Sequence, residues 1–100
     1  MAEVNWTKFA LENISDIADF ISKDSVSYAE LFVRRIFEKV VILQDHPNSG
    51  RIVPEFENIH IRELIFGNYR IVYRLIDPGV DIITVHHSAR LLSNSPLFDN

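Results

Sequence analysis

The chain has 100 residues, of which 47% are hydrophobic and 24% charged, and its formal net charge is −4. Such a chain has enough apolar material for one core, so we expect a single domain over residues 1–100. It contains no cysteine, which excludes disulfides and thiol nucleophiles and fits a reducing, cytoplasmic location. No apolar run reaches the roughly 18 residues of a membrane helix, and no secretory-signal pattern is present, so we expect no membrane association.

The first part of the chain has helical periodicity. Apolar residues recur every three or four positions over residues 10–22, which predicts an amphipathic helix with Thr7 as its N-cap. Residues 3–6 alternate between polar and apolar side chains, so we expect a short strand before this helix.

A second helical pattern follows after a break of a few residues and extends to Gln44. Ser27 has the spacing of a capping box with Glu30, although Asp24 or Ser25 could cap the helix instead. The short break predicts an antiparallel hairpin of two helices. The buried stripe of the second helix is expected to comprise Ala29, Phe32, Val33, Ile36, Phe37, Val40 and Leu43.

After Gly50 the pattern changes to strands. Residues 59–66, 69–76 and 80–87 are rich in β-branched and aromatic side chains, and turn sequences separate them. We therefore predict an α+β fold of two layers. An antiparallel sheet of about four strands would carry the α-helical hairpin on one face, in the order β-α-α-β-β-β.

The middle strand of this meander places its arginines on one face. Tyr69, Ile71, Tyr73 and Leu75 share the face expected to pack against the helices. Arg70 and Arg74 would then point outward from the opposite face, where they could meet a partner or substrate. Pairing of these arginines with Glu63 or Asp81 on adjacent strands is the structural alternative.

No motif predicts a cofactor or a metal. The sequence has no glycine-rich phosphate loop, no zinc-protease motif and no nucleophile elbow. His86 and His87 are adjacent on a predicted strand, so their side chains leave on opposite faces and cannot both bind one ion. We expect neither a cofactor nor a metal site.

Five short motifs follow one another along the chain. They are Trp6-Thr7, the Pro-x-x-Gly-Arg of residues 47–51, Arg62-Glu63-Leu64, the Tyr-Arg-Ile-Val-Tyr-Arg of residues 69–74, and Val85-x-His87-x-x-Arg90. With these motifs on this pattern of elements, residues from about 4 to 91 resemble the RelE/ParE toxin superfamily, and within it the ParE-like branch.

The resemblance implies the toxin of a type II toxin–antitoxin system, of the kind linked to plasmid stabilisation. Its partner would be a cognate antitoxin, a small DNA-binding protein of the ParD or RelB type, bound in a hetero-oligomer; a toxin homodimer is also possible. Such antitoxins fold into an apolar groove around the helical hairpin, and Phe20, Val26, Leu31, Leu97 and Phe98 would supply apolar surface for it.

ParE-like toxins inhibit DNA gyrase, whereas RelE-like toxins cleave messenger RNA on the ribosome. Three features favour gyrase: no lysine follows Lys39, the last tyrosine is Tyr73, and the net charge is negative. In the nuclease alternative, Arg70, Arg74, His87 and Arg90 would form the catalytic set. A third alternative is an inert, toxin-like binding module.

The candidate binding residues are mostly arginines of the second half, namely Arg51, Arg62, Arg70, Arg74, His87 and Arg90. Arg51 and Arg90 lie at the ends of predicted elements, where an arginine can instead bridge loops. For His87, a buried and hydrogen-bonded role is the alternative to a functional one. The tail of residues 91–100 is expected to be flexible, or to pack on the sheet edge or on a partner.

Overall fold

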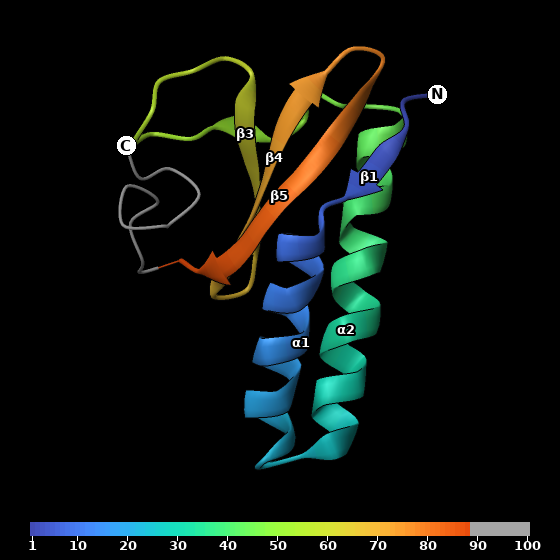
Figure 1. The fold of residues 1–100 in the computed structure, drawn as a ribbon, viewed down its shortest axis with the longest axis vertical. Helices are drawn as coiled ribbons and strands as arrows, with labels where there is room; N and C mark the ends of the chain where they lie inside the picture. The colour runs from blue at the N-terminus through green and yellow to red at the C-terminus, as the bar shows by residue number, and fades with distance from the viewer. Residues whose placement is uncertain (89–100) are drawn as a thin grey trace.

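The computed structural model describes residues 1–88, and Arg90, Leu97, Phe98 and the rest of the predicted tail lie outside them. Two long helices and a five-stranded sheet form two layers, which confirms the α+β fold with a helical hairpin on one face (Figure 1). The elements are β1 (Val4–Trp6), α1 (Lys8–Ser22), α2 (Val26–Lys39), the 3₁₀ helix η1 (Val40–Gln44), β2 (Arg51–Ile52), β3 (Ile61–Phe66), β4 (Tyr69–Ile76) and β5 (Gly79–His87).

The sheet has the strand order β1-β5-β4-β3-β2. The pairs from β2 to β5 are antiparallel, as the meander predicts, and the two-residue β2 adds a strand to the expected set. β1 pairs with β5 in parallel, with Asn5 opposite Asp81. The first and last strands are therefore neighbours (Figure 1).

Side-chain caps define where both helices begin. The Thr7 hydroxyl accepts a hydrogen bond from the Ala10 N–H, which confirms the predicted N-cap, and it donates to the Ile82 carbonyl at 2.8 Å. Ser25, one of the three candidate caps of the second helix, accepts from the Tyr28 N–H at 3.1 Å. These bonds satisfy N–H groups that have no partner inside the helix.

The main core lies between the helical hairpin and one face of the sheet. Its most deeply buried side chains include Ile36, Leu43, Ile71, Tyr73, Val80 and Ile82. The predicted stripe of α2 is buried except at Phe37, which is 37% exposed, and at Val33, which is partly buried. Phe37 lies at the margin of the core because it packs against Trp6 of β1, with ring centroids 4.7 Å apart.

The opposite face of the sheet is partly covered by the segment between β2 and β3. Val53 and Phe56 of this segment pack against Val72 and Ile83 in a second, smaller apolar cluster. Arg70 lies under the same cover and is only 5% exposed, so the expectation that it points into solvent is wrong. Arg74 is exposed, as expected.

The helical hairpin extends beyond the turn that joins β3 and β4 (Figure 1). This leaves apolar side chains at its far end without a sheet to cover them. Within residues 1–88, no helix combines the length and hydropathy that crossing a membrane requires.

Candidate functional site

A buried network of charges occupies the loop-covered face of the sheet. The Glu63 carboxylate accepts hydrogen bonds from Arg70 Nε and Arg51 Nε, each at 2.5 Å. Both terminal nitrogens of Arg70 donate to the Glu55 carboxylate at 2.7 Å. The Glu55 hydrogen bonds are the largest reason why the pKa of Arg70 is raised above its ordinary value. Two carboxylates thus offset the charge of Arg70.

The other candidate arginines differ in their surroundings. Arg51 is held through its Nε atom, but its side chain is 59% exposed. Arg62 donates to the carbonyls of Asn48, Gly50 and Ile59, at 3.2, 3.0 and 3.1 Å, so it joins the loops on either side of β2.

His87 lies on the face of the sheet that carries the helices. It is exposed, which contradicts the buried alternative, and it pairs in register with Tyr69, with ring centroids 5.8 Å apart. His86, which pairs with Arg70, is the buried histidine. Tyr69 and Arg74 lie five positions apart on β4, or about 17 Å at the usual strand rise.

The candidate residues therefore fall into separate groups. Arg51 and Arg70 meet at Glu63. Arg74 lies on the same face but further along β4, and His87 lies on the opposite face. The structure does not bring Arg70, Arg74 and His87 into one cluster, and Arg90 lies outside the described residues. Among residues 1–88, no group of three or more His, Cys, Asp or Glu side chains is arranged to hold a metal ion.

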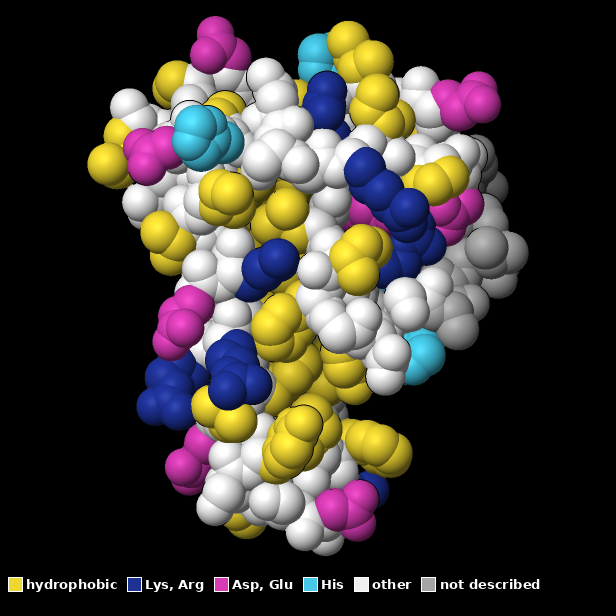
Figure 2. Space-filling view, turned by 180° about the vertical axis from the view of Figure 1, so that it is seen from behind, with side chains coloured by type: hydrophobic (Ala, Val, Ile, Leu, Met, Phe, Trp, Pro, Cys, Tyr) yellow, Lys and Arg dark blue, Asp and Glu magenta, His cyan; other side chains and the backbone are white. Residues whose placement is uncertain are grey.

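Two hollows lie on either side of Tyr69, between the helical hairpin and the sheet. We call the first the hairpin hollow. Its volume is about 470 Å³, and its lining comprises Ile21, Tyr28, Leu31, Phe32, Arg35, Phe66, Gly67, Asn68 and Tyr69. Figure 2 shows hydrophobic side chains gathered between the end of the hairpin and the rest of the molecule. Because Phe32 packs edge-on against Tyr69, with centroids 5.3 Å apart, a rigid aromatic floor supports this hollow.

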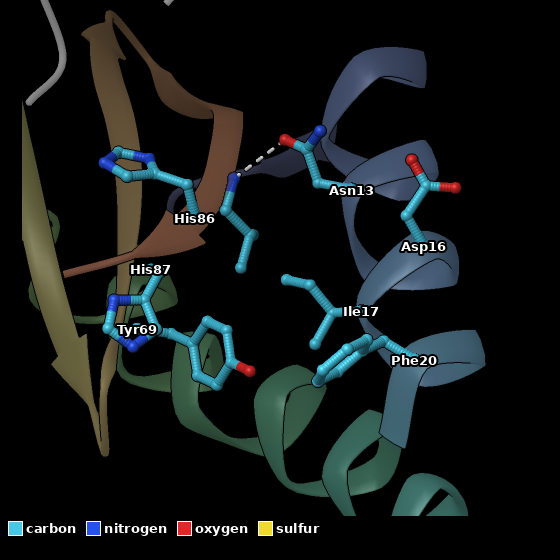
Figure 3. A pocket seen from close by; sticks show the side chains of 8 residues that line it. Asn13, Asp16, Ile17, Phe20, Tyr69, His86 and His87 are labelled. Atoms are coloured by element: carbon cyan, nitrogen blue, oxygen red, sulfur yellow. Dashed lines mark hydrogen bonds between the residues drawn. The ribbon is translucent and has the colours of Figure 1, made fainter. Parts of the chain in front are cut away.

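We call the second the histidine hollow. Its volume is about 360 Å³, and its lining comprises Asn13, Asp16, Ile17, Phe20, Tyr69, Val85, His86 and His87. The α1 residues lie opposite those of the sheet (Figure 3). The Asn13 amide oxygen accepts from the Val85 N–H at 3.0 Å and from the Thr84 hydroxyl at 2.8 Å, which holds α1 and β5 at a fixed spacing. Tyr69 lines both hollows, so the two adjoin each other, and we call them together the groove.

Several large apolar side chains in this part of the helical hairpin are exposed. Phe20 is 68% exposed, Tyr28 is 65% exposed, and Val26 is also exposed. The prediction of uncovered apolar surface is therefore confirmed at Phe20 and Val26, while Leu31 lines the hairpin hollow. Tyr28 and Tyr69 were missed as groove residues, although the outward-facing position of Tyr28 on the helical pattern could have indicated it.

A hairpin of helices on one face of a mixed sheet is also the fold of a known structure described as the chromosomal ParDE TA system from P. aeruginosa. The TM-score is 0.73, with 23% sequence identity over 87% of this chain and 96% of that chain. The two proteins thus share one fold.

The family follows from the sequence comparisons. The model of the family "ParE toxin of type II toxin-antitoxin system, parDE" matches residues 4–92. The chain is 33% identical to "Toxin RelE2" of Caulobacter vibrioides, over 91% of this chain and all of that protein. It is 36% identical to "Putative toxin Y4kP" of Sinorhizobium fredii, over 85% of this chain and 86% of that protein. The chain belongs to the ParE toxin family of type II toxin–antitoxin systems, which confirms the resemblance.

Proposed function

We propose that a cognate antitoxin neutralises this toxin by placing an amphipathic segment in the groove on either side of Tyr69. The observation that carries this proposal is the uncovered aromatic surface at the groove. Phe20 and Tyr28 are each about two-thirds exposed, Tyr28 at the largely apolar hairpin hollow and Phe20 at the histidine hollow, whose lining is half apolar. Patches of this kind on a soluble protein mark binding surfaces for other proteins.

The likeness of this chain to the P. aeruginosa structure, which is described as a ParDE TA system, supports this proposal. Toxin and antitoxin would form a hetero-oligomer in the cytoplasm. A locus that encodes both proteins would stabilise the plasmid or chromosome segment that carries it. The same groove could serve a toxin homodimer, which the antitoxin would then displace.

We further propose that the toxin acts on DNA gyrase and does not cleave RNA. Cleavage through a 2′-hydroxyl needs a base, an acid and cations placed around one phosphate. In residues 1–88, Arg70 is buried and offset by Glu55 and Glu63, and His87 lies on the other face from Arg74. The net charge of −4 would also weaken binding to the ribosome.

Two assays with the purified toxin distinguish these targets. We expect inhibition of DNA supercoiling by gyrase and no cleavage of messenger RNA on programmed ribosomes. Cleaved message with unaffected gyrase would overturn the gyrase proposal in favour of the nuclease alternative. If the toxin affects neither reaction and its expression without antitoxin leaves growth normal, the chain is an inert binding module.

A further inference from the structure

The two hollows carry opposite charges. Among the described residues that line the hairpin hollow, Arg35 of α2 is the only one with a full charge at neutral pH. Among those that line the histidine hollow, Asp16 of α1 is the only carboxylate. Neither side chain forms an ion pair with another residue of the described part of the chain. Both charges are exposed and available to an occupant.

Apolar side chains line both hollows beside these charges. Tyr69 contributes to both hollows, with Phe32 on one side and Ile17 on the other. Apolar contacts of this kind supply affinity without direction, because a leucine or phenylalanine can enter either hollow. Charges at the rim of an interface have the complementary effect, since they fix register and exclude wrong arrangements more than they add affinity.

We infer that the segment bound in this groove carries a carboxylate where it meets Arg35 and a cation where it meets Asp16. The chemistry of the partner is thus an amphipathic peptide with apolar anchors between two opposite charges. The order of these charges decides in which direction the peptide runs along the groove. This inference rests on the proposed function, in which the groove is the site of the antitoxin.

The test uses two synthetic peptides with leucines at every third or fourth position. One peptide carries Glu near its N-terminus and Lys near its C-terminus, and the other has Gln at both places. Each has a nitroxide at the N-terminus, which broadens the amide NMR signals of nearby toxin residues. We expect the charged peptide to bind about fivefold more tightly than the neutral one, since exposed ion pairs contribute little each. Its nitroxide should broaden signals around Arg35 and Asn68.

Exchange of the charges at positions 16 and 35 of the toxin should reverse the direction in which the peptide binds. In the Asp16→Lys/Arg35→Glu double variant, the nitroxide of the same charged peptide should broaden signals around Asn13 and His87. The matched control is Asp19→Asn/Arg34→Gln, because these exposed neighbours line neither hollow. The control should leave both affinity and direction unchanged. At 1 M salt, the advantage of the charged peptide should disappear, because the Debye length falls to about 3 Å.

Equal affinity for the two peptides, or an unchanged direction in the exchanged variant, would overturn the inference. Peptide binding that leaves the signals of Phe66 and Tyr69 unshifted would also overturn it, and so would an absence of binding. The proposed function is judged separately, by whether the Phe20→Asp variant escapes neutralisation by the natural antitoxin. If Phe20→Asp prevents neutralisation while the peptides bind without a preferred direction, the groove is the antitoxin site and the inference about its charges is wrong.

Discussion

Glu63 and Arg70 form an ion pair between β3 and β4 in which neither side chain is more than 6% exposed. The pair does not stand alone, because the second oxygen of Glu63 binds Arg51 and the outer nitrogens of Arg70 bind Glu55. Charges that are excluded from water need all of these hydrogen bonds, since burying an unpaired charge costs much free energy of folding. The network therefore fixes the segment that carries Glu55 to the sheet.

Replacement of Glu63 by Gln should destabilise the protein strongly. The substitution leaves the buried guanidinium of Arg70 with a neutral neighbour in place of a carboxylate, and loss of one partner of a buried ion pair costs about 3 kcal/mol. Urea unfolding followed by circular dichroism measures this change. Arg51→Gln is the matched control, because it removes the exposed partner of the same carboxylate and should cost less than about 1 kcal/mol. Equal effects would contradict this account of the network.

Tyr73→Phe should lower the stability of the protein, because it removes hydrogen bonds to the loop before β2. The buried hydroxyl donates to the Pro47 carbonyl at 2.7 Å and accepts from the Gly50 N–H at 2.9 Å. Removal of the hydroxyl leaves both backbone groups without this partner, so we expect a loss of about 2 kcal/mol in the free energy of unfolding. Tyr28→Phe is the control, because Tyr28 is exposed, and should change stability by less than about 0.5 kcal/mol.

Tyr73 should also make the protein sensitive to alkali. Burial raises the pKa of Tyr73 above its ordinary value, despite the opposing effects of the Gly50 N–H and of Arg62. Above about pH 10, tyrosine ionises in the unfolded chain while the folded protein keeps the Tyr73 proton, so unfolding becomes more favourable. The free energy of unfolding should therefore fall between pH 9 and pH 11 by more in the wild type than in Tyr73→Phe. Parallel pH profiles would rule this out.

Gly50→Ala should be poorly tolerated for steric reasons. A Cβ atom there would lie 2.7 Å from the Glu63 carbonyl oxygen and 2.6 Å from the Tyr73 hydroxyl. The backbone contact cannot be relieved by a side-chain rotation, so we expect a cost of about 2 kcal/mol, measured by thermal unfolding. Gly67→Ala makes a useful comparison, because open space surrounds Gly67 and its positive φ alone should cost about 1 kcal/mol.

Phe20→Asp should separate neutralisation from folding. Phe20 is mostly exposed at the rim of the histidine hollow, so its loss should change stability by less than about 0.5 kcal/mol. A carboxylate in an apolar contact should nevertheless weaken antitoxin binding at least tenfold, since burying it without a partner is unfavourable. Growth of cells that express toxin and antitoxin together measures this effect. Val41→Asp, exposed but away from the groove, should leave neutralisation intact.

The sequence predicted the elements well because periodicity and caps are local signals. The strand Tyr69–Ile76 was predicted to the residue, and so was the end of α1 at Ser22. The burial of Arg70 could not be predicted in this way. It depends on Glu55, which lies 15 positions earlier in a segment without regular periodicity, and no alternation rule places such a segment over a sheet.

The groove, too, could be predicted only where local sequence patterns indicate it. Phe20 and Val26 stood out from the sequence because they fall outside the buried stripes of their helices. Tyr69 was expected in the core, since it alternates with Ile71 and Tyr73. It does pack against the core, but it is only partly buried, because it lies at the start of β4 with a hollow on either side of its ring.

The parallel pairing of β1 with β5 has a consequence for biosynthesis. Asn5 and Asp81 are partners in the sheet although they lie 76 positions apart. β1, the first strand to leave the ribosome, therefore cannot pair until β5, the last strand of the described residues, has been synthesised. Contacts between such distant positions form late and slow folding. During translation the sheet of the nascent toxin therefore stays incomplete, and its β1 edge unpaired, until β5 has been synthesised.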